Sequence, residues 1–201
     1  MPQKPMPPKA DHKPHTGVRD QILESAIILM RQSGLSGARI NQILEHSKAP
    51  KGSMYYYFPK GKLQITREAL ERYGARVATA METALASKNK PTGKVRALFH
   101  SIAHRLEQSN FEQSCAVGAV ALDLNADVDE LRPLVAEIMA SWRRTIASHF
   151  AMRTRAKGES FAGLVLSAIE GGYVRGRAER SSAPLLEAAE WIAHLADAEA
   201  K

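Results

Sequence analysis

Several features that define large classes of protein are missing from this chain of 201 residues. Its single cysteine, Cys115, excludes an internal disulfide framework and is typical of a reducing compartment. No stretch approaches the roughly 20 consecutive apolar residues that a transmembrane helix requires, and the N-terminal segment lacks an apolar signal region. We therefore expect a cytoplasmic protein that makes no membrane contact.

Signatures of catalysis are equally scarce. The chain has no glycine-rich phosphate loop after a strand, no His-Glu-x-x-His pattern and no paired cysteines, so we expect no metal site and no cofactor. Cys115 with His100 or His104 could in principle supply a nucleophile and a base, but no convincing third residue would orient them. A helical enzyme that uses Cys115 and His104 remains an alternative.

The alternating pattern of a half-buried strand is also absent, and apolar residues recur at helical spacing from residue 18 onward. We therefore predict an all-α fold. The expected helices span about 18–33, 39–47, 50–58, 63–87, 94–109, 113–124, 128–151, 159–179 and 184–198. The expected interruptions include Gly34 and Lys157-Gly158.

Residues 39–58 carry the most specific pattern. The first helix of this segment has one apolar face, formed by Ile40, Ile43 and Leu44. Pro50 favours the start of a second helix, because its missing N–H costs nothing in a first turn. Gly52 and Ser53 lack bulk, so the free N–H groups at that end could approach a phosphate. Two short helices joined by a tight turn predict a helix-turn-helix.

Four of the twelve aromatic residues lie at positions 55–58 of this second helix. Met54 and Phe58 are four residues apart, so we expect both to point into the core. Three consecutive tyrosines cannot all be buried, because neighbours on a helix differ by about 100° around its axis. At least one of Tyr55, Tyr56 and Tyr57 must face outward.

Positive charge is concentrated in the same part of the chain. Residues 1–63 contain ten lysines and arginines against four acidic residues, whereas residues 64–201 contain eighteen against seventeen. Such a local field attracts phosphate backbones. Residues 1–16 hold five prolines and three lysines, which indicates a flexible basic tail that is either an arm along DNA or inert. A protein that binds nucleic acid without sequence preference is a second alternative.

The segment Ala49-Pro50-Lys51-Gly52-Ser53 to Phe58-Pro59 resembles the helix-turn-helix signature of TetR-type transcriptional regulators, and is most similar to the LmrA/YxaF-like branch. Cys115-Ala-Val-Gly and Glu170-Gly-Gly-Tyr are also similar to that branch. Family members usually carry Ser or Thr at Arg39 and glycine at Lys48, and often histidine at Tyr56 or Tyr57. These departures predict a weaker helix cap, the loss of the left-handed helix stop and altered DNA contacts.

The predicted DNA surface lies on and beside the second short helix. It comprises Arg39, Lys51, Gly52, Ser53, Tyr55, Tyr56, Tyr57 and Lys62. In the remaining helices, aromatic, methionine and polar residues could line a small-molecule pocket, and the resemblance implies such an effector pocket there. The candidates are Phe99, His104, Phe111, Cys115, Met139, Trp142, Phe161 and Tyr173.

Two C-terminal helices, about 159–179 and 184–198, combine glycines with large apolar residues and could pair with their two-fold copies. The resemblance implies this arrangement for a homodimer. The predicted organisation is a tail (1–16), a helix-turn-helix domain (17–63) and a helical effector-binding and dimerisation domain (64–201). We expect a repressor that a small apolar effector releases from a palindromic, double-stranded operator.

Overall fold

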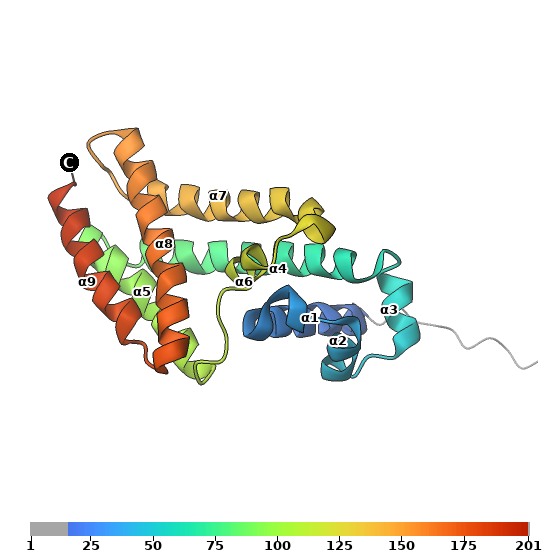
Figure 1. Cartoon of the computed structure of the whole chain (residues 1–201). Coiled ribbons are helices and arrows are strands. Elements are labelled where there is room, and N and C mark those ends of the chain that lie inside the picture. Colours follow the sequence, from blue (N-terminus) through green and yellow to red (C-terminus); the bar gives the residue numbers. More distant parts are fainter. Residues whose placement is uncertain (1–15, 201) are drawn as a thin grey trace, which may run out of the picture.

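The computed structural model describes residues 16–200, and that part of the chain consists of helices and loops without a β-strand (Figure 1). The predicted all-α fold class is confirmed. The helices are α1 (Thr16–Gly37), α2 (Ile40–Ser47), α3 (Lys51–Tyr57), α4 (Gly61–Ala86), α5 (Pro91–Gln108), α6 (Ala116–Leu122), the 3-10 helix η1 (Ala126–Leu131), α7 (Arg132–Ser148), α8 (Arg155–Glu179) and α9 (Ala183–Ala198). Except for Thr16, the predicted tail at 1–16 lies outside the described residues.

Helices α1, α2 and α3 form a small head at one end of the molecule (Figure 1). Its core contains Ile43 and Leu44 of α2 and Met54 of α3, and Phe58 closes it just after α3 ends. These residues are the ones whose helical spacing predicts burial. The first turn of α4 follows directly, so the head is joined to the rest of the chain by a continuous helix of 26 residues.

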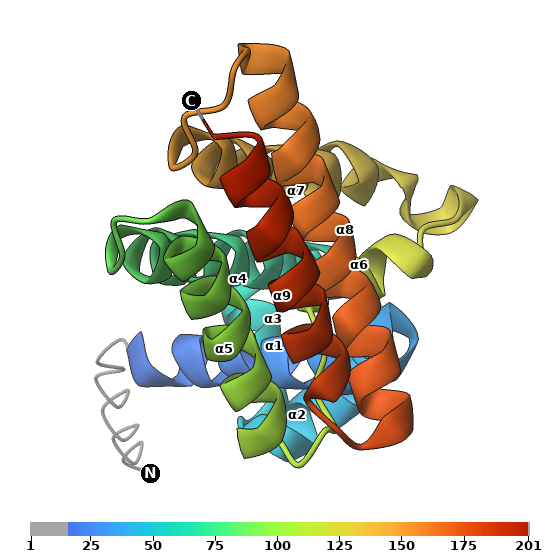
Figure 2. The same ribbon diagram turned by 90° about the vertical axis from the view of Figure 1, so that its left-hand side faces the viewer.

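The remaining helices form the body. Helix α9 lies between α5 and α8, as Figure 2 shows, while α7 packs against both α4 and α8. Helix α6 belongs to the body by sequence but packs against α1 of the head. The predicted boundary at residue 63 therefore falls within α4, and head and body share a packed contact through α1 and α6.

Of two predicted helix interruptions, the structure has one and lacks the other. Ser33 and Gly34 have non-helical backbone angles, with φ at +65° for Gly34, so regular helix is interrupted at the predicted stop. The predicted break at Lys157-Gly158 is wrong, because Thr154 Oγ1 accepts a hydrogen bond from the Lys157 N–H (3.2 Å) and caps a helix that begins at Arg155.

Lys48 adopts the left-handed conformation (φ 56°, ψ 21°) that ends α2, so the expected loss of this stop is wrong. The conformation costs a side-chain-bearing residue roughly 1–2 kcal/mol, which the packed head offsets. At the other end of α2, Arg39 has no acceptor with which to cap the helix, and Gln42 Oε1 accepts from the Arg39 N–H instead (3.2 Å).

Candidate nucleic-acid interface and buried cavity

Helix α3 separates its aromatic residues between the core and solvent. Met54 is fully buried, whereas Tyr55 and Tyr56 are 62% and 74% exposed. Tyr57 is half-buried, and its ring meets that of Tyr56 edge to face with centroids 4.9 Å apart. The expectation that at least one tyrosine faces outward is confirmed for two of them. Because the buried Met54 holds α3 against the core, the exposed rings of Tyr55 and Tyr56 form a surface that is available for contact.

The start of α3 is open. Lys51 and Gly52 are exposed and Ser53 is half-buried, and a Cβ built on Gly52 would meet no atom within 4 Å. Internal packing therefore does not require glycine at position 52, but its lack of a side chain leaves the backbone accessible. Arg39, at the N-terminal end of α2, is also exposed. Lys48 and Lys60 are exposed on either side of α3 and extend its positive surface. They were not among the predicted DNA-contacting residues, although their positions next to the helix-turn-helix motif could have identified them.

Lys62 is placed differently from the other predicted DNA-contacting residues. Its side chain is half-buried, and Nζ donates to the Leu35 carbonyl at 2.8 Å. Burial is the main cause that lowers the pKa of Lys62, with a further contribution from the charge of Arg39. The Lys62 ammonium group thus holds the end of α1 next to α4.

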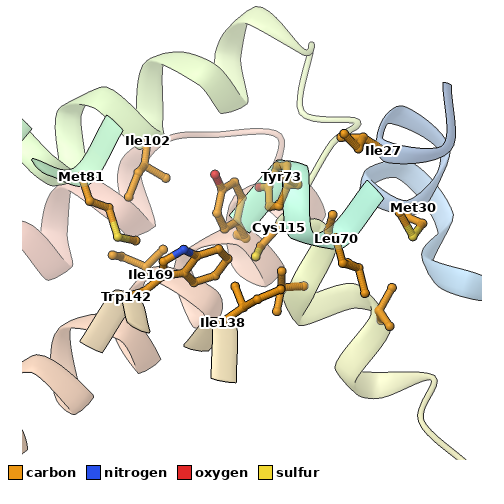
Figure 3. Close-up of a cluster of buried hydrophobic side chains, with 14 of the residues drawn as sticks. Ile27, Met30, Leu70, Tyr73, Met81, Ile102, Cys115, Ile138, Trp142 and Ile169 are labelled. Carbon is orange, nitrogen blue, oxygen red and sulfur yellow. The ribbon is translucent and has the colours of Figure 1, made fainter. Parts of the chain in front are cut away.

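Helices of the body, together with α1 of the head, line a partly open cavity of about 220 Å³. Three of the predicted pocket residues line it, namely Cys115, Trp142 and Tyr173. Trp142 is fixed there because it is buried and its Nε1 donates to the Gly74 carbonyl at 2.9 Å. Figure 3 shows Trp142, Ile169 and Tyr73 around this space, with Cys115 close to Tyr73.

The other five predicted pocket residues lie elsewhere. Phe99 is packed into the core, and His104 is exposed, with Nε2 2.9 Å from the Gln108 side-chain nitrogen. Phe161 packs against Phe150 near the start of α8, with ring centroids 4.9 Å apart. Phe111 and Met139 line an open groove along α6 and α8. Composition identified pocket-forming residue types but could not decide which helix faces meet.

The cavity is more polar than the sequence suggested, because charged residues come to it from four different helices. They are Arg31 of α1, Arg76 of α4, Arg105 of α5 and Glu170 of α8. Glu170 is one residue of the Glu170-Gly-Gly-Tyr motif, and its carboxylate lies against Gly118 of the Cys115-Ala-Val-Gly motif, where an added Cβ would come within 2.2 Å of it. The two short motifs therefore meet in space.

Cys115 has the surroundings of a structural thiol. It is buried, its Sγ accepts from the Gly118 N–H at 3.3 Å at the start of α6, and burial together with the charge of Glu170 raises its pKa well above the usual value. A raised pKa leaves little thiolate, which is the nucleophilic form. His104 is exposed and does not line the cavity that holds Cys115, so the predicted alternative of a Cys115–His104 pair is wrong.

Helices α8 and α9 carry an exposed apolar surface. Its large members are Leu164, Val174, Trp191 and Leu195. Gly172 and Gly176 do not contribute, because added Cβ atoms would come 2.3 Å from Leu185 and 2.6 Å from Leu106. These two glycines let α8 pack closely on α9 and α5 within the chain, whereas Gly171 faces open space.

The comparisons with known proteins agree with this architecture. The family model described as the C-terminal domain of LmrA/YxaF-like transcriptional regulators matches residues 91–191. Over 176 residues the chain is 27% identical to the uncharacterised HTH-type transcriptional regulator YxaF of Bacillus subtilis (strain 168), a match that covers 87% of this chain and 92% of YxaF.

Two solved structures share the fold. A regulatory protein TetR from Rhodobacter sphaeroides superposes with a TM-score of 0.80 at 19% identity, covering 88% of this chain and 97% of that one. A cysteine variant of the TetR family regulator CifR, complexed with 26-base-pair double-strand operator DNA, gives a TM-score of 0.76 at 19% identity and covers 94% of this chain and 98% of that one.

These relatives are transcriptional regulators, which decides against the helical-enzyme alternative. Within residues 16–200, no helix is both long enough and apolar enough to cross a membrane. The match over residues 91–191, the all-helical fold and the helix-turn-helix together show that the chain belongs to the TetR family of transcriptional regulators, in its LmrA/YxaF-like branch.

Proposed function

We propose that two copies of this chain bind a palindromic operator through α3 and repress transcription until a small molecule enters the cavity of the body. The observation that carries the DNA-binding part is α3 itself, which buries Met54 and presents Tyr55 and Tyr56 to solvent beside Lys51. Anchored recognition helices of this size read base edges in the major groove. The CifR structure supports the assignment by fold alone.

The proposed DNA surface combines two kinds of contact. Lys51, Ser53 and Tyr55 would read bases or sugar edges from α3, while exposed Arg39, Lys48 and Lys60 would contact phosphates on either side. Tyr56, Tyr57 and the open backbone at Gly52 complete it. Lys62 would contribute to DNA binding indirectly, because its hydrogen bond to the Leu35 carbonyl holds the end of α1 in place.

The exposed apolar surface of α8 and α9 supports the homodimer. Trp191 is 79% exposed, and large apolar side chains gathered on one surface mark association sites. A two-fold axis would place α8 and α9 against their copies in a four-helix interface. The two copies of α3 would then meet successive major grooves, roughly 34–36 Å apart or somewhat more.

Contacts between the head and the body support regulation by a ligand. Arg31 lines the cavity, and its Nε donates to the Ser114 carbonyl (2.9 Å) while the Ser114 N–H donates back to the Arg31 carbonyl (2.8 Å). Arg177 of α8 donates to the Gln32 carbonyl at 2.9 Å. The C-terminal part of α1 is therefore tied to the walls of the cavity, so a ligand that shifts these walls would move the head. Release requires tighter ligand binding to the DNA-incompetent arrangement.

The DNA-binding proposal is tested by selecting genomic fragments with the purified protein and measuring affinity for the recovered sequence. Tyr55→Ala and Tyr56→Ala should each weaken operator binding, by about 1–3 kcal/mol where the ring contacts a base, because both side chains are exposed and the fold does not depend on them. The thermal midpoint should stay unchanged. Met54→Ala is the matched control, because removing this buried side chain should cost about 2–5 kcal/mol of stability.

A discrete palindrome supports the proposal. Equal retention of all fragments would instead favour the protein that binds nucleic acid without sequence preference, and unaltered operator affinity in both tyrosine variants would move the DNA surface away from α3.

A further inference from the structure

The cavity has an apolar side and a polar side. Met81, Trp142 and Ile169 are among its apolar walls. The polar side combines Arg31 and Arg105 with the phenol groups of Tyr73 and Tyr173. These four side chains come from four different helices and line the same cavity. A volume of about 220 Å³ is small compared with typical pockets for drug-sized ligands, so the space suits a compound of one or two rings.

The two tyrosine hydroxyls are donors that lack an acceptor in the protein. Tyr73 and Tyr173 are only 7% and 6% exposed, yet neither hydroxyl forms a hydrogen bond within residues 16–200. No side-chain oxygen or nitrogen in that range is both fully enclosed and unpaired, so the two hydroxyls keep some accessible surface, and both tyrosines line the cavity. Each hydroxyl is therefore available to donate a hydrogen bond to an acceptor on a ligand that enters the cavity.

The charges that face the cavity are predominantly positive. Arg76 is neutralised by a two-pronged contact with Glu24, with distances of 3.0 and 2.5 Å. Arg31 uses only Nε in its bond to Ser114, and its Cζ lies 5.9 Å from the centre of the Tyr73 ring. Arg105 has no hydrogen bond or ion pair from its side chain within the described range. Glu170 is the one acidic side chain among the lining residues, and burial raises its pKa, so the folded state disfavours its charged form.

We propose that the ligand of this cavity is a small organic anion, with a flat apolar body against Trp142 and an anionic head that accepts hydrogen bonds from Tyr73 and Tyr173 beside Arg31 and Arg105. The head supplies the acceptors that the hydroxyls lack and the negative charge that the arginines attract. This inference differs from the expected small apolar effector in giving the ligand an anionic head. It rests on the proposed function only in treating the ligand as the regulatory effector.

The test compares two probes of the same shape, 2-naphthoate and its neutral amide 2-naphthamide, by calorimetric titration of the full chain without DNA. The carboxylate should bind about tenfold more tightly or better, since a hydrogen bond to a charged group contributes roughly 1.5–3 kcal/mol. Arg105→Gln should remove most of this preference and leave the affinity for the amide nearly unchanged. Arg105→Lys, which keeps the charge, should restore part of it.

Arg153→Gln is the matched control, because Arg153 is exposed and does not line the cavity, so this variant should retain the full preference. Equal binding of the two probes, tighter binding of the amide, or binding of neither overturns the proposal. Because the titration contains no DNA, such a result leaves the operator test unaffected. Conversely, a protein that prefers the carboxylate but selects no operator would refute the proposed function and leave the anion site standing.

Discussion

Individual side chains in this protein have roles that depend on which way they face. Tyr55, Tyr56 and Met54 are neighbours in sequence, yet two are exposed and one is buried. Two nearby lysines differ in the same way. Lys60 is exposed, whereas Nζ of Lys62, two residues later, donates a hydrogen bond to the Leu35 carbonyl. Substitutions of neighbouring, chemically identical residues should therefore have different consequences.

The lysine pair gives the first prediction at this scale. Lys60→Ala should lower the affinity for all DNA sequences alike and reduce the slope of log K against log salt by about one, as expected for a phosphate contact. Lys62→Ala should lower the thermal midpoint, because it removes the bond to the Leu35 carbonyl. Its salt slope should change less than that of Lys60→Ala. Filter binding at several salt concentrations, paired with thermal unfolding, separates the two effects; a slope reduced only by the Lys62 variant would give that lysine the phosphate contact.

Glu170 gives a prediction about pH. Burial raises its pKa above the ordinary value of 4.5, so the folded state disfavours its charged form. Such a group contributes stability below its unfolded pKa, and that contribution is lost as the pH rises through the folded pKa. Glu170→Gln cannot ionise, so its thermal midpoint relative to the parent should rise as the pH increases from about 5 to 8.

The groups that face Glu170 do not interfere over this range. Burial also raises the pKa values of Cys115, Tyr73 and Tyr173, so these groups remain neutral there. The same substitution at exposed Glu187 should give a difference that hardly varies with pH. A constant difference for the Glu170 variant would show that its carboxyl is not destabilised by burial.

At the scale of whole elements, α6 links the cavity to the head. Cys115 at its start lines the cavity, and Asp123 at its end accepts hydrogen bonds from the Leu35 and Ser36 N–H groups at 2.6 and 3.1 Å. Those amides follow the interruption of α1 at Gly34, so they lack the partners that an unbroken helix would provide. The seven residues of α6 thus connect the cavity with the head.

We predict that Asp123→Ala weakens this connection. The variant should bind the cavity probe with nearly the parent affinity, while the probe should weaken operator binding less than the fivefold to 150-fold that is typical of allosteric coupling. The measurement is operator affinity with and without saturating 2-naphthoate. Asp127→Ala is the control, since this exposed residue lies beyond the link. Parent-like coupling in the Asp123 variant would exclude α6 as the connection.

For the whole molecule, the proposed homodimer requires a surface that holds two heads at the spacing of DNA grooves. The sequence favours the last two helices, but many of their apolar residues serve the fold of the single chain. Ile192 is only 5% exposed, and Leu185 of α9 is fully buried against Gly172 of α8. Only residues on the outer side, such as Leu164 and Trp191, remain for a second copy.

We therefore predict that Leu164→Glu combined with Trp191→Glu gives folded monomers, because charges would be buried at the interface without partners. Sedimentation should show half the parent mass, and tight operator binding should be lost while the helical content is kept. Ile192→Glu should instead unfold the chain. Thr79→Glu on the exposed side of α4 is the neutral control. Dimers in the double variant would place the interface elsewhere.

The sequence by itself determined the helical class, the helix-turn-helix and the burial of Met54 and Phe58, because these follow from spacing within one helix. It also located the excess positive charge. Periodicity shows which residues share a helix face, and a short segment such as α3 can be interpreted without knowing the rest of the chain.

Only the tertiary structure decided which faces meet. It placed Arg31, Arg105 and Glu170 from separate helices around Cys115, and it sent Phe99, His104 and Phe161 elsewhere. It also assigned Gly118 to make room for Glu170, and Lys62 to hold α1. These relations join residues far apart in sequence, and they depend on the angles at which long helices cross, which no local pattern specifies.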